Sequence, residues 1–472
     1  MVLSDCYSWD NEQSGHARLG DPRRTRRLVS LTSSLAQHAG LSIVKSSQST
    51  AQVEGAYRLI RNPSVSPQAI AEAGFTATVR ACEAHPLLLA LEDTTTINFS
   101  HSTASDDQGN TTTNPKTHGL LAHSVLMYAP DSALPVGFIE QQRWSRVTDT
   151  YGVKHQRKER PCEEKESYRW QQASERMAER LGEIQKRVIT VCDREADIWH
   201  YLHYKVSHGQ RFVVRAAQNS RLEEAPGKLF ELPEVLATAG SHTLNVMQKG
   251  GRAARQARMF IRYSEVSIKI ATTVASAADA RRIVSHYERR WLIEEYHKAW
   301  KSGGTCVESL RMQTRDNLER MVVIKAFIAV RVLGLRQEGI SEETQNDSCK
   351  KILTPTEWKL LWVKLEGKQL PSQTPTLKWA CLKLGRWHDS KRTGRPGWVV
   401  MWDGWFRLQD MVEGYPVMKS LTQAYFLCIS PIPGHRLPLT TSIESPLIAR
   451  CLSLIDIVLA QVPVTHSQNA HV

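Results

Sequence analysis

Three carboxylates stand about a hundred residues apart in segments of different character. Asp93 ends the apolar run 86–93 and Asp193 ends the run 187–193, and such short runs are typical of strands buried on both faces. Glu294 lies in a segment with helical periodicity. If that helix packs against the sheet, the three carboxylates can converge on Mg²⁺ or Mn²⁺, because these ions prefer oxygen ligands. A metal pair can activate water or a 3′ hydroxyl and stabilise the leaving oxygen, so phosphoryl transfer is the predicted chemistry.

Polar residues at steps of three and four surround Glu294 and form one stripe of the predicted helix 277–301: Tyr287, Arg290, Glu294, Lys298 and Lys301. The cations of this stripe could hold phosphates. The plainer alternative is an array of ion pairs one turn apart. The apolar members of the same helix are expected to face inward, namely Trp291, Leu292, Tyr296 and Ala299. Paired carboxylates also occur in glycosidases, but that chemistry leaves the cations without a role.

The charge of the chain favours an acidic polymer as partner. Its 472 residues include 61 Lys and Arg against 48 Asp and Glu, a net charge of +13. Neutralising phosphates releases counterions, so this balance suits a nucleic acid, although many basic enzymes share it. The N-terminal segment concentrates the bias on two predicted helices, one starting at Asp21-Pro22 and one over 51–62, which carry Arg23, Arg24, Arg26, Arg27, Arg58 and Arg61. These helices predict a small DNA-facing domain, or else a solvated basic surface.

Cysteine usage and hydropathy exclude several classes of protein. The nine cysteines are scattered and form no CxxC pair, so neither a disulfide framework nor a zinc site is indicated. Cys192 is expected to pack inside a strand, and His123 and His297 are expected to be ordinary structural histidines. Neither a signal peptide nor a membrane span is apparent, so a cytoplasmic location is expected.

The elements that must position the carboxylates follow from periodicity. We expect a hairpin over 123–129 and 134–144, a helix over 165–181, a β-rich stretch from 211 to 270, a helix over 317–336, and a Trp-rich helical region beyond 350. Trp398, Trp402 and Trp405 fall on one helical stripe of that region, which by itself indicates core packing more often than an interface.

The stripe around Glu294 matches a family signature. The pattern YxxRxxxExxxxxxK is met in full by the string YERRWLIEEYHKAWK, and on it the chain resembles the DDE transposases of the IS-four group. The strings LEDTT, VCDREADI, RFVVR, LGDPRRT and EGAYRLIRNP are similar to the family's as well. The resemblance runs from about residue 15 to 418.

The resemblance implies an α/β fold with an RNase H-like catalytic core that carries a β-strand insertion. An N-terminal helical DNA-binding domain and a C-terminal helical dimerisation domain would flank this core. The implied boundaries are 1–70 for end binding, 71–345 for the catalytic domain with its insertion at about 194–280, 346–420 for dimerisation, and 421–472 for a tail of unclear structure.

The resemblance also implies roles for individual residues. Asp93, Asp193 and Glu294 would be catalytic and would bind two Mg²⁺ ions, with Mn²⁺ as a substitute. DNA phosphates would contact Tyr287, Arg290, Lys298, Lys301, Arg211 and Arg215. End recognition would fall to Arg23, Arg24, Arg26, Arg27, Arg58 and Arg61, and dimerisation to Trp398, Trp402 and Trp405.

The family's reaction is cut-and-paste transposition in bacteria, near the nucleoid. Its steps are end nicking, hairpin formation and opening, and strand transfer, performed on double-stranded DNA by a homodimer that assembles on the DNA. The implied partners are therefore terminal inverted repeats, target DNA and a second copy of the chain.

The sequence departs from the family between Arg215 and Tyr287. This stretch is shorter than usual and contains no Trp, whereas the family places a Trp-containing strand just before the signature helix to support a flipped base. Residues 267–273 could form a substitute strand. Two alternatives therefore stay open, a catalytically impaired DNA-end-binding protein or transposition inhibitor, and an RNase H-like nuclease without end specificity.

Overall fold

The computed structural model describes residues 6–99, 109–112, 117–146, 160–222, 227–246, 253–264, 266–268, 270–272, 277–340, 344–367, 369–387 and 398–429. The chain forms two compact units. One holds Tyr7–Gly334, and the other holds the chain from Leu335 onward. The predicted tail beyond residue 429 lies outside the described residues.

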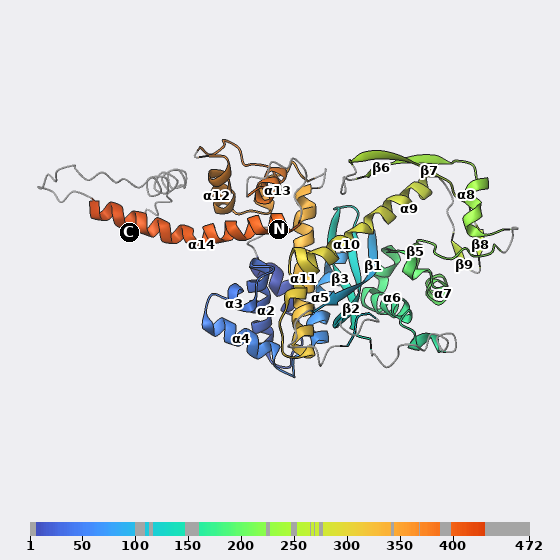
Figure 1. Ribbon diagram of the computed structural model, residues 1–472, viewed down its shortest axis with the longest axis horizontal. Coiled ribbons are helices and arrows are strands. Elements are labelled where there is room, and N and C mark those ends of the chain that lie inside the picture. The colour runs from blue at the N-terminus through green and yellow to red at the C-terminus, as the bar shows by residue number, and fades with distance from the viewer. Residues whose placement is uncertain are drawn as a thin grey trace, which may run out of the picture. The chain divides into compact units, whose positions relative to one another are not determined.

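A mixed five-stranded sheet is the centre of the first unit (Figure 1). Its strands are β1 (Leu88–Asn98), β2 (Gly119–Ala129), β3 (Leu134–Trp144), β4 (Val188–Cys192) and β5 (Arg211–Val214), in the order β3-β2-β1-β4-β5. The first three are antiparallel neighbours, and β4 and β5 run parallel to β1. The predicted hairpin is confirmed, and this mixed α/β sheet is consistent with an RNase H-like core.

Alternating side chains of the strands bury both faces of the sheet. Ile139 of β3 belongs to a cluster that includes Met177 of α6 (Tyr168–Leu181). The next residue toward the N-terminus, Phe138, points to the other face, where its ring lies 4.5 Å from that of Tyr296 and 6.1 Å from that of Phe327. These two rings belong to α10 (Trp291–Lys298) and α11 (Arg315–Ile340). The sheet is therefore covered by helices on both sides.

The N-terminal helices pack onto the same unit. They are α1 (Cys6–Ser14), α2 (Pro22–Gln37), α3 (Ile43–Ser46), α4 (Thr50–Ile60) and α5 (Pro67–Cys82). As predicted, α2 begins after Asp21, whose carboxylate accepts a hydrogen bond from the Arg23 amide, and α4 ends before Pro63. The buried Arg320 of α11 donates to the carbonyl oxygens of Ile60 and Val65. This guanidinium ties the end of the basic segment to the catalytic core.

The β-rich stretch contributes little to the central sheet. After β5 come α8 (Leu232–Val235) and a separate hairpin, β6 (Gly240–Val246) with β7 (Arg255–Ile261). The predicted substitute strand over 267–273 is wrong, because β8 (Val266–Ile268) and β9 (Ile270–Thr272) pair with each other outside that sheet. The helix α7 (Trp199–Ser207) and β5 fall within the range expected for the insertion, yet β5 is a strand of the central sheet. The five strands are thus complete without the shortened segment.

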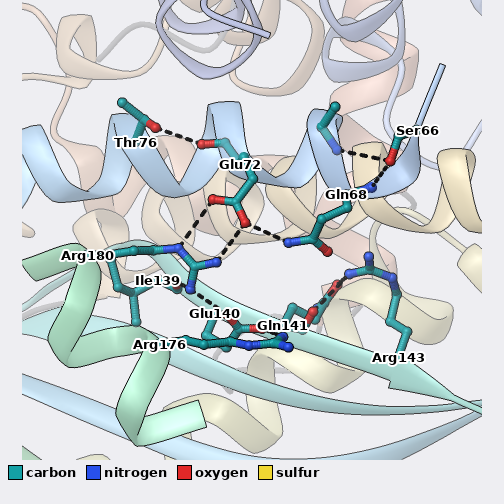
Figure 2. Close-up of polar contacts among 11 residues, drawn as sticks. Ser66, Gln68, Glu72, Thr76, Ile139, Glu140, Gln141, Arg143, Arg176 and Arg180 are labelled. Carbon is teal, nitrogen blue, oxygen red and sulfur yellow. Dashed lines mark hydrogen bonds and ion pairs between the residues drawn. The ribbon is translucent and has the colours of Figure 1, made fainter. Parts of the chain in front are cut away.

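The outer strand β3 is protected by arginines (Figure 2). Arg180 of α6 donates to the Ile139 carbonyl at 3.2 Å, and Arg143 donates to the Gln141 carbonyl at 3.0 Å. Arg180 also joins Glu72 of α5 to the buried Glu140. Since an edge strand with open backbone groups invites pairing with other chains, these side chains cover a vulnerable edge.

The second unit is helical. Its helices are α12 (Pro355–Leu365), α13 (Leu377–Gly385) and α14 (Trp398–Ile429), with α14 packed on the other two. Trp402 and Trp405 are buried inside this unit, whereas the side chain of Trp398 lies outside the described residues. None of the described helices has the length and apolar character needed to span a membrane.

Candidate active site

Two of the three predicted carboxylates are placed by neighbouring parallel strands. Leu91 of β1 pairs with Val191 of β4, so two residues further along each chain the register brings Asp93 beside Asp193. Asp193 follows β4 directly, as predicted, and its Oδ1 accepts the Glu195 amide at 2.8 Å. The prediction that Asp93 ends its strand is wrong, because β1 continues to Asn98 through its pairing with β2.

The third carboxylate comes from a helix that is broken where it meets the sheet. Instead of one helix over 277–301, α9 (Ala277–Arg289) ends before Arg290 and α10 begins at Trp291, with a π-helical turn over Ala299–Gly303. At the break, two backbone hydrogen bonds span three residues instead of the four of an α-helix. The Arg290 amide donates to the Tyr287 carbonyl, and the Ile293 amide donates to the Arg290 carbonyl. The resulting α10 packs on β1 and carries Glu294 to Asp93.

One ligand atom from each of Asp93, Glu294 and His297 lies within 4.8 Å of the others. Asp93 is only 7% exposed, and Glu294 is partly exposed at the surface of the site. Asp193 is not a member of this close group, but its charge acts on Asp93. Carboxylate oxygens and an imidazole nitrogen at this separation suit a divalent cation.

The electrostatics of the site also favour a cation. Burial and the negative charges of Glu294 and Asp193 raise the pKa of Asp93, and Arg290 opposes them, with a net result of about 7. Arg290 places Nη1 3.8 Å from Asp93 Oδ2 and Nη2 3.3 Å from Glu294 Oε1. Burial lowers the pKa of Arg290, but Asp93 and Asp193 raise it more, so the net shift is upward. One guanidinium therefore balances carboxylates that repel one another.

His297 is a site residue that the sequence interpretation assigned to the structural background. Its Nδ1 lies 3.7 Å from Asp93 Oδ2, and its side chain is 6% exposed. Burial, and with it the positive charges of Lys301, His123 and Arg290, lowers the pKa of His297 to about 3. The imidazole is thus neutral near pH 7, the form that binds metal. Its spacing of three residues from Glu294 was the available signal, because such residues share a helix face.

The rest of the stripe is distributed around this centre. Lys298 places Nζ 4.6 Å from the centre of the Trp291 ring, and Lys301 Nζ lies 3.6 Å from Glu308 Oε1. Tyr287 is half-buried. Trp291 was expected to face inward, but it is 53% exposed, because it stands four residues after Tyr287 and three before Glu294 and so shares their helix face. The other three inward predictions, for Leu292, Tyr296 and Ala299, are confirmed.

Of the two phosphate contacts predicted at β5, Arg215 lies beside Asp193, whereas Arg211 lies at the opposite end of the strand. Arg211 begins β5 and Arg215 follows it, and both are exposed. Arg211 donates to the Lys186 carbonyl at 2.9 Å, while the Arg215 amide bonds to the Cys192 carbonyl. Cys192 itself is buried, with Sγ 3.5 Å from the Tyr201 hydroxyl, as expected for strand packing. His123 is also fully buried and contacts Thr94.

The N-terminal arginines divide into two groups. Arg24 donates to the Leu19 carbonyl at 2.9 Å, and the guanidinium of Arg27 packs against Gly55, where no Cβ would fit. The side chains that remain exposed on α2 and α4 are Arg23, Arg26, Arg58 and Arg61. Only part of the predicted end-recognition set is therefore open to a ligand in this structure.

Comparison with known families matches two parts of the chain. Residues 7–65 match the family "Transposase DNA-binding", which covers the helices with the basic side chains. Residues 167–331 match the family "Transposase DDE domain", which includes Asp193, His297 and Glu294. Asp93 lies outside the second match, and its place in the site rests on the pairing of β1 with β4 and on the packing of α10. The chain therefore combines a transposase DNA-binding region with a transposase DDE domain, which supports its identification as a DDE transposase.

Proposed function

We propose that this protein is a cut-and-paste transposase of the IS-four group that resembles the transposase of transposon five. It would nick the terminal repeats of its element, form and open hairpins, and join the freed ends to target DNA. The observation that carries this proposal is the convergence of Asp93, Glu294 and His297 within 4.8 Å, with Asp193 acting on the same group.

The donor set fits divalent metal, and we infer two Mg²⁺ ions, with Mn²⁺ as a substitute. Asp93, Asp193 and Glu294 would hold them, with His297 as a neutral fourth donor. The ions would supply activation of the attacking oxygen and charge stabilisation at the leaving oxygen. Arg290 would hold a non-bridging phosphate oxygen, because its guanidinium lies beside the carboxylates at which the reacting phosphate would bind.

DNA would be held on both sides of this centre. Phosphates near the cleaved bond would be contacted from two elements. These contacts would come from Tyr287, Lys298 and Lys301 on the signature helix, and from Arg211 and Arg215 at β5. Arg23, Arg26, Arg58 and Arg61 would contact the terminal repeat, since they are the exposed members of the basic helices. Arg24 and Arg27 would support the same helices from within.

We further propose that the protein acts as a homodimer assembled on DNA through its C-terminal unit. Trp402 and Trp405 pack inside that unit, so they would support the contact and not form it. The exposed apolar side chains of α14, which include Val400, Val417 and Leu421, are better suited to meet a second copy.

The rival function is DNA-end binding without cleavage. The shortened segment before Tyr287 is the reason to consider this rival, because loss of a core strand would misplace Glu294. The central sheet has its five strands without that segment, and Glu294 reaches Asp93. Both observations favour an active enzyme.

The proposal is tested with purified protein and a labelled DNA fragment that carries the element's terminal repeat, in Mg²⁺, Mn²⁺ or EDTA. We expect metal-dependent nicks and hairpins at the repeat boundary on a denaturing gel. Asp93→Asn, Asp193→Asn and Glu294→Gln should each abolish cleavage and leave end binding intact. Asp131→Asn, which removes a surface carboxylate paired with His85, serves as the matched control and should cleave normally. Undiminished cleavage by any of the three variants would refute the site, and binding without cleavage by the unaltered protein would favour the rival.

A further inference from the structure

A polar cavity of about 380 Å³ lies at the outer edge of the sheet, where α5, α6 and α11 meet β3. It is separate from the carboxylate site, and none of the proposed DNA contacts lines it. Figure 2 shows how several of its side chains gather over this edge. Donor-rich side chains dominate its wall: Arg143, Arg169, Arg176, Gln68, Gln142 and Gln172.

Protection of the edge strand accounts for only part of this cluster. Arg180 and Arg143 cap backbone carbonyls of β3. Among the described residues, the guanidinium groups of Arg169 and Arg176 donate no hydrogen bond to a backbone carbonyl of β3. They stand seven residues apart on α6, so both guanidinium groups lie on one helix face above the cavity, with Gln172 between them.

Two of the arginines have unused donors in the interior. The side chain of Arg143 is 5% exposed, and its Nε has no hydrogen-bond partner among the described residues. Its nearest ion pair is long, 4.0 Å to Glu319 Oε2. The buried Nε of Arg169 likewise has no hydrogen-bond partner in the described part of the chain. Such donors cost free energy unless a ligand or water satisfies them.

The nearby carboxylates are already bound by other arginines. Two of these carboxylates, Asp316 and Glu319, line the cavity itself: Arg315 donates to Glu319 at 3.0 Å, and Arg320 lies 3.5 Å from Asp316. Arg146 lies 2.8 Å from Glu166. Glu140, which is 3.5 Å from Arg176, is shared with Arg180.

The arginines of α6 are left with excess positive charge. Burial lowers the pKa of Arg169, and the positive charge of Arg176 lowers it too, although Glu166 opposes this shift. The charged side chains that line the cavity are three arginines and two carboxylates, so its wall carries a net positive charge.

We propose that this cavity binds a phosphate group, with Arg143, Arg169 and Arg176 as its ligands. Guanidinium forks match the oxygens of a phosphate in pairs, and the amide of Gln172 in the wall adds a neutral donor. The phosphate could come from the backbone of DNA or from a free phosphate compound. The DNA source rests on the proposed function, whereas the site itself does not.

The cavity is connected to the carboxylate site through Gln141. Its Nε2 donates to Ser124 Oγ at 3.1 Å and to the Tyr296 hydroxyl at 3.4 Å. Ser124 is the register partner of Asp93, and Tyr296 lies beside His297 on α10. Two strand spacings separate Gln141 from Asp93, roughly 10 Å across the sheet. A phosphate held here would therefore be close to the reacting DNA without touching the metal ligands.

The first experiment uses inorganic phosphate and the full-length protein. Thermal unfolding is followed while phosphate replaces chloride at constant ionic strength. Binding to the folded state should raise the midpoint in a saturable manner. The shift should be much smaller in Arg169→Gln and in Arg176→Gln. It should persist in Lys186→Gln, which also removes one exposed, ion-paired cation.

The second experiment identifies the source of the phosphate. Duplex DNA binding is measured over a range of salt concentrations for the same variants. If the site takes a DNA phosphate, Arg176→Gln should reduce the slope of log K against log salt by about 0.9, whereas Lys186→Gln should leave it unchanged.

Each outcome decides the proposal. A phosphate-dependent shift lost in the Arg variants, together with a reduced slope, supports a DNA backbone site. The same shift with an unchanged slope supports the phosphate site and assigns it to a free phosphate compound. No saturable shift, or an equal shift in the Arg169→Gln and Arg176→Gln variants, overturns the proposal. Metal-dependent cleavage by the unaltered protein is scored separately, so a failure of the transposase assignment remains distinguishable.

Discussion

A neutral histidine buried beside a carboxylate is a strong functional candidate at the scale of single residues. His297 lies 3.7 Å from Asp93, and its low pKa keeps it uncharged. It can ligate metal directly or hold the Asp93 side chain in place. Either role predicts a change in metal dependence when the residue is replaced.

We expect His297→Gln to weaken metal-dependent cleavage by about 10-fold to 100-fold, the range observed when metal-orienting residues are lost. The loss should be partly recovered at high Mn²⁺ concentration, because the defect is one of metal affinity. Cleavage as a function of Mn²⁺ concentration is the measurement. His286→Gln, which alters a similarly buried histidine on α9, is the control. Identical Mn²⁺ curves for the two variants would remove His297 from the site.

A second residue-scale prediction concerns the pH dependence of stability. Lys325 of α11 is buried, donates to the Thr305 carbonyl, and has a pKa lowered by burial to about 8. An unfolded lysine has a pKa near 10.5, so between pH 8 and 10.5 the unfolded chain binds more protons than the native one. The unfolding free energy contributed by this residue therefore rises with pH in that window and stays at its lowest value below pH 8.

Lys325→Met removes this titration. The difference in unfolding free energy between the unaltered protein and the variant should shift in favour of the unaltered protein by about 3 kcal/mol from pH 8 to 10.5. Urea unfolding of both proteins at several pH values measures this difference. Cysteines and tyrosines that titrate in the same pH range are present in both proteins, so their contributions cancel. A pH-independent difference would show that Lys325 is not desolvated in the native state.

At the scale of elements, the edge strand β3 depends on a buried charge cluster. Glu140 is fully buried and is matched mainly by Arg180, which also holds Glu72 (Figure 2). Removing one partner of a buried pair leaves an uncompensated charge. The cluster therefore couples α5 and α6 to the strand.

We expect Arg180→Met to lower the unfolding free energy by ~3 kcal/mol or more. Lys186→Met, which breaks an exposed pair with Glu183, should change it by less than about 1 kcal/mol. Denaturant unfolding of both variants provides the comparison. Equal effects would mean that the Glu140 charge is solvated or otherwise compensated.

Helical elements were predicted well where their ends have local causes. Asp21 caps α2, and Pro63 follows the end of α4, so nearby residues decide both boundaries. The interruption at Arg290 has no such local mark. It accompanies the packing of α10 on β1, a contact between segments that lie far apart in the sequence.

At the scale of the whole molecule, the chain divides into a unit with the proposed catalytic residues and a helical C-terminal unit. Every residue proposed to contact metal or DNA belongs to the first unit. The proposed dimer contact belongs to the second. The two activities should therefore be separable by truncation.

A chain that ends at Ile340 should still bind DNA bearing the terminal repeat, and it should do so with one protein per end. The full chain should form a complex with two protein copies. Sedimentation of protein with labelled DNA measures the stoichiometry. A dimeric complex from the truncated chain would place the interface in the first unit.

The sequence alone determined the chemistry available to this protein. The order of residues along the chain is enough to identify the carboxylates Asp93, Asp193 and Glu294. It also identifies the cations around Glu294 and the signature that they form with it. The buried strands and their hairpin also followed from apolar runs, because burial of such runs is the main driving force of folding.

The tertiary structure decided which groups meet. The pairing of β1 with β4 and the packing of α10 bring together residues about two hundred positions apart, and they add His297 to the group. They also decide that arginines from β3 and α6 enclose a cavity. Such contacts depend on register, helix breaks and burial, which are properties of the packed whole; local sequence carries only the three-residue spacing that puts His297 on the helix face of Glu294.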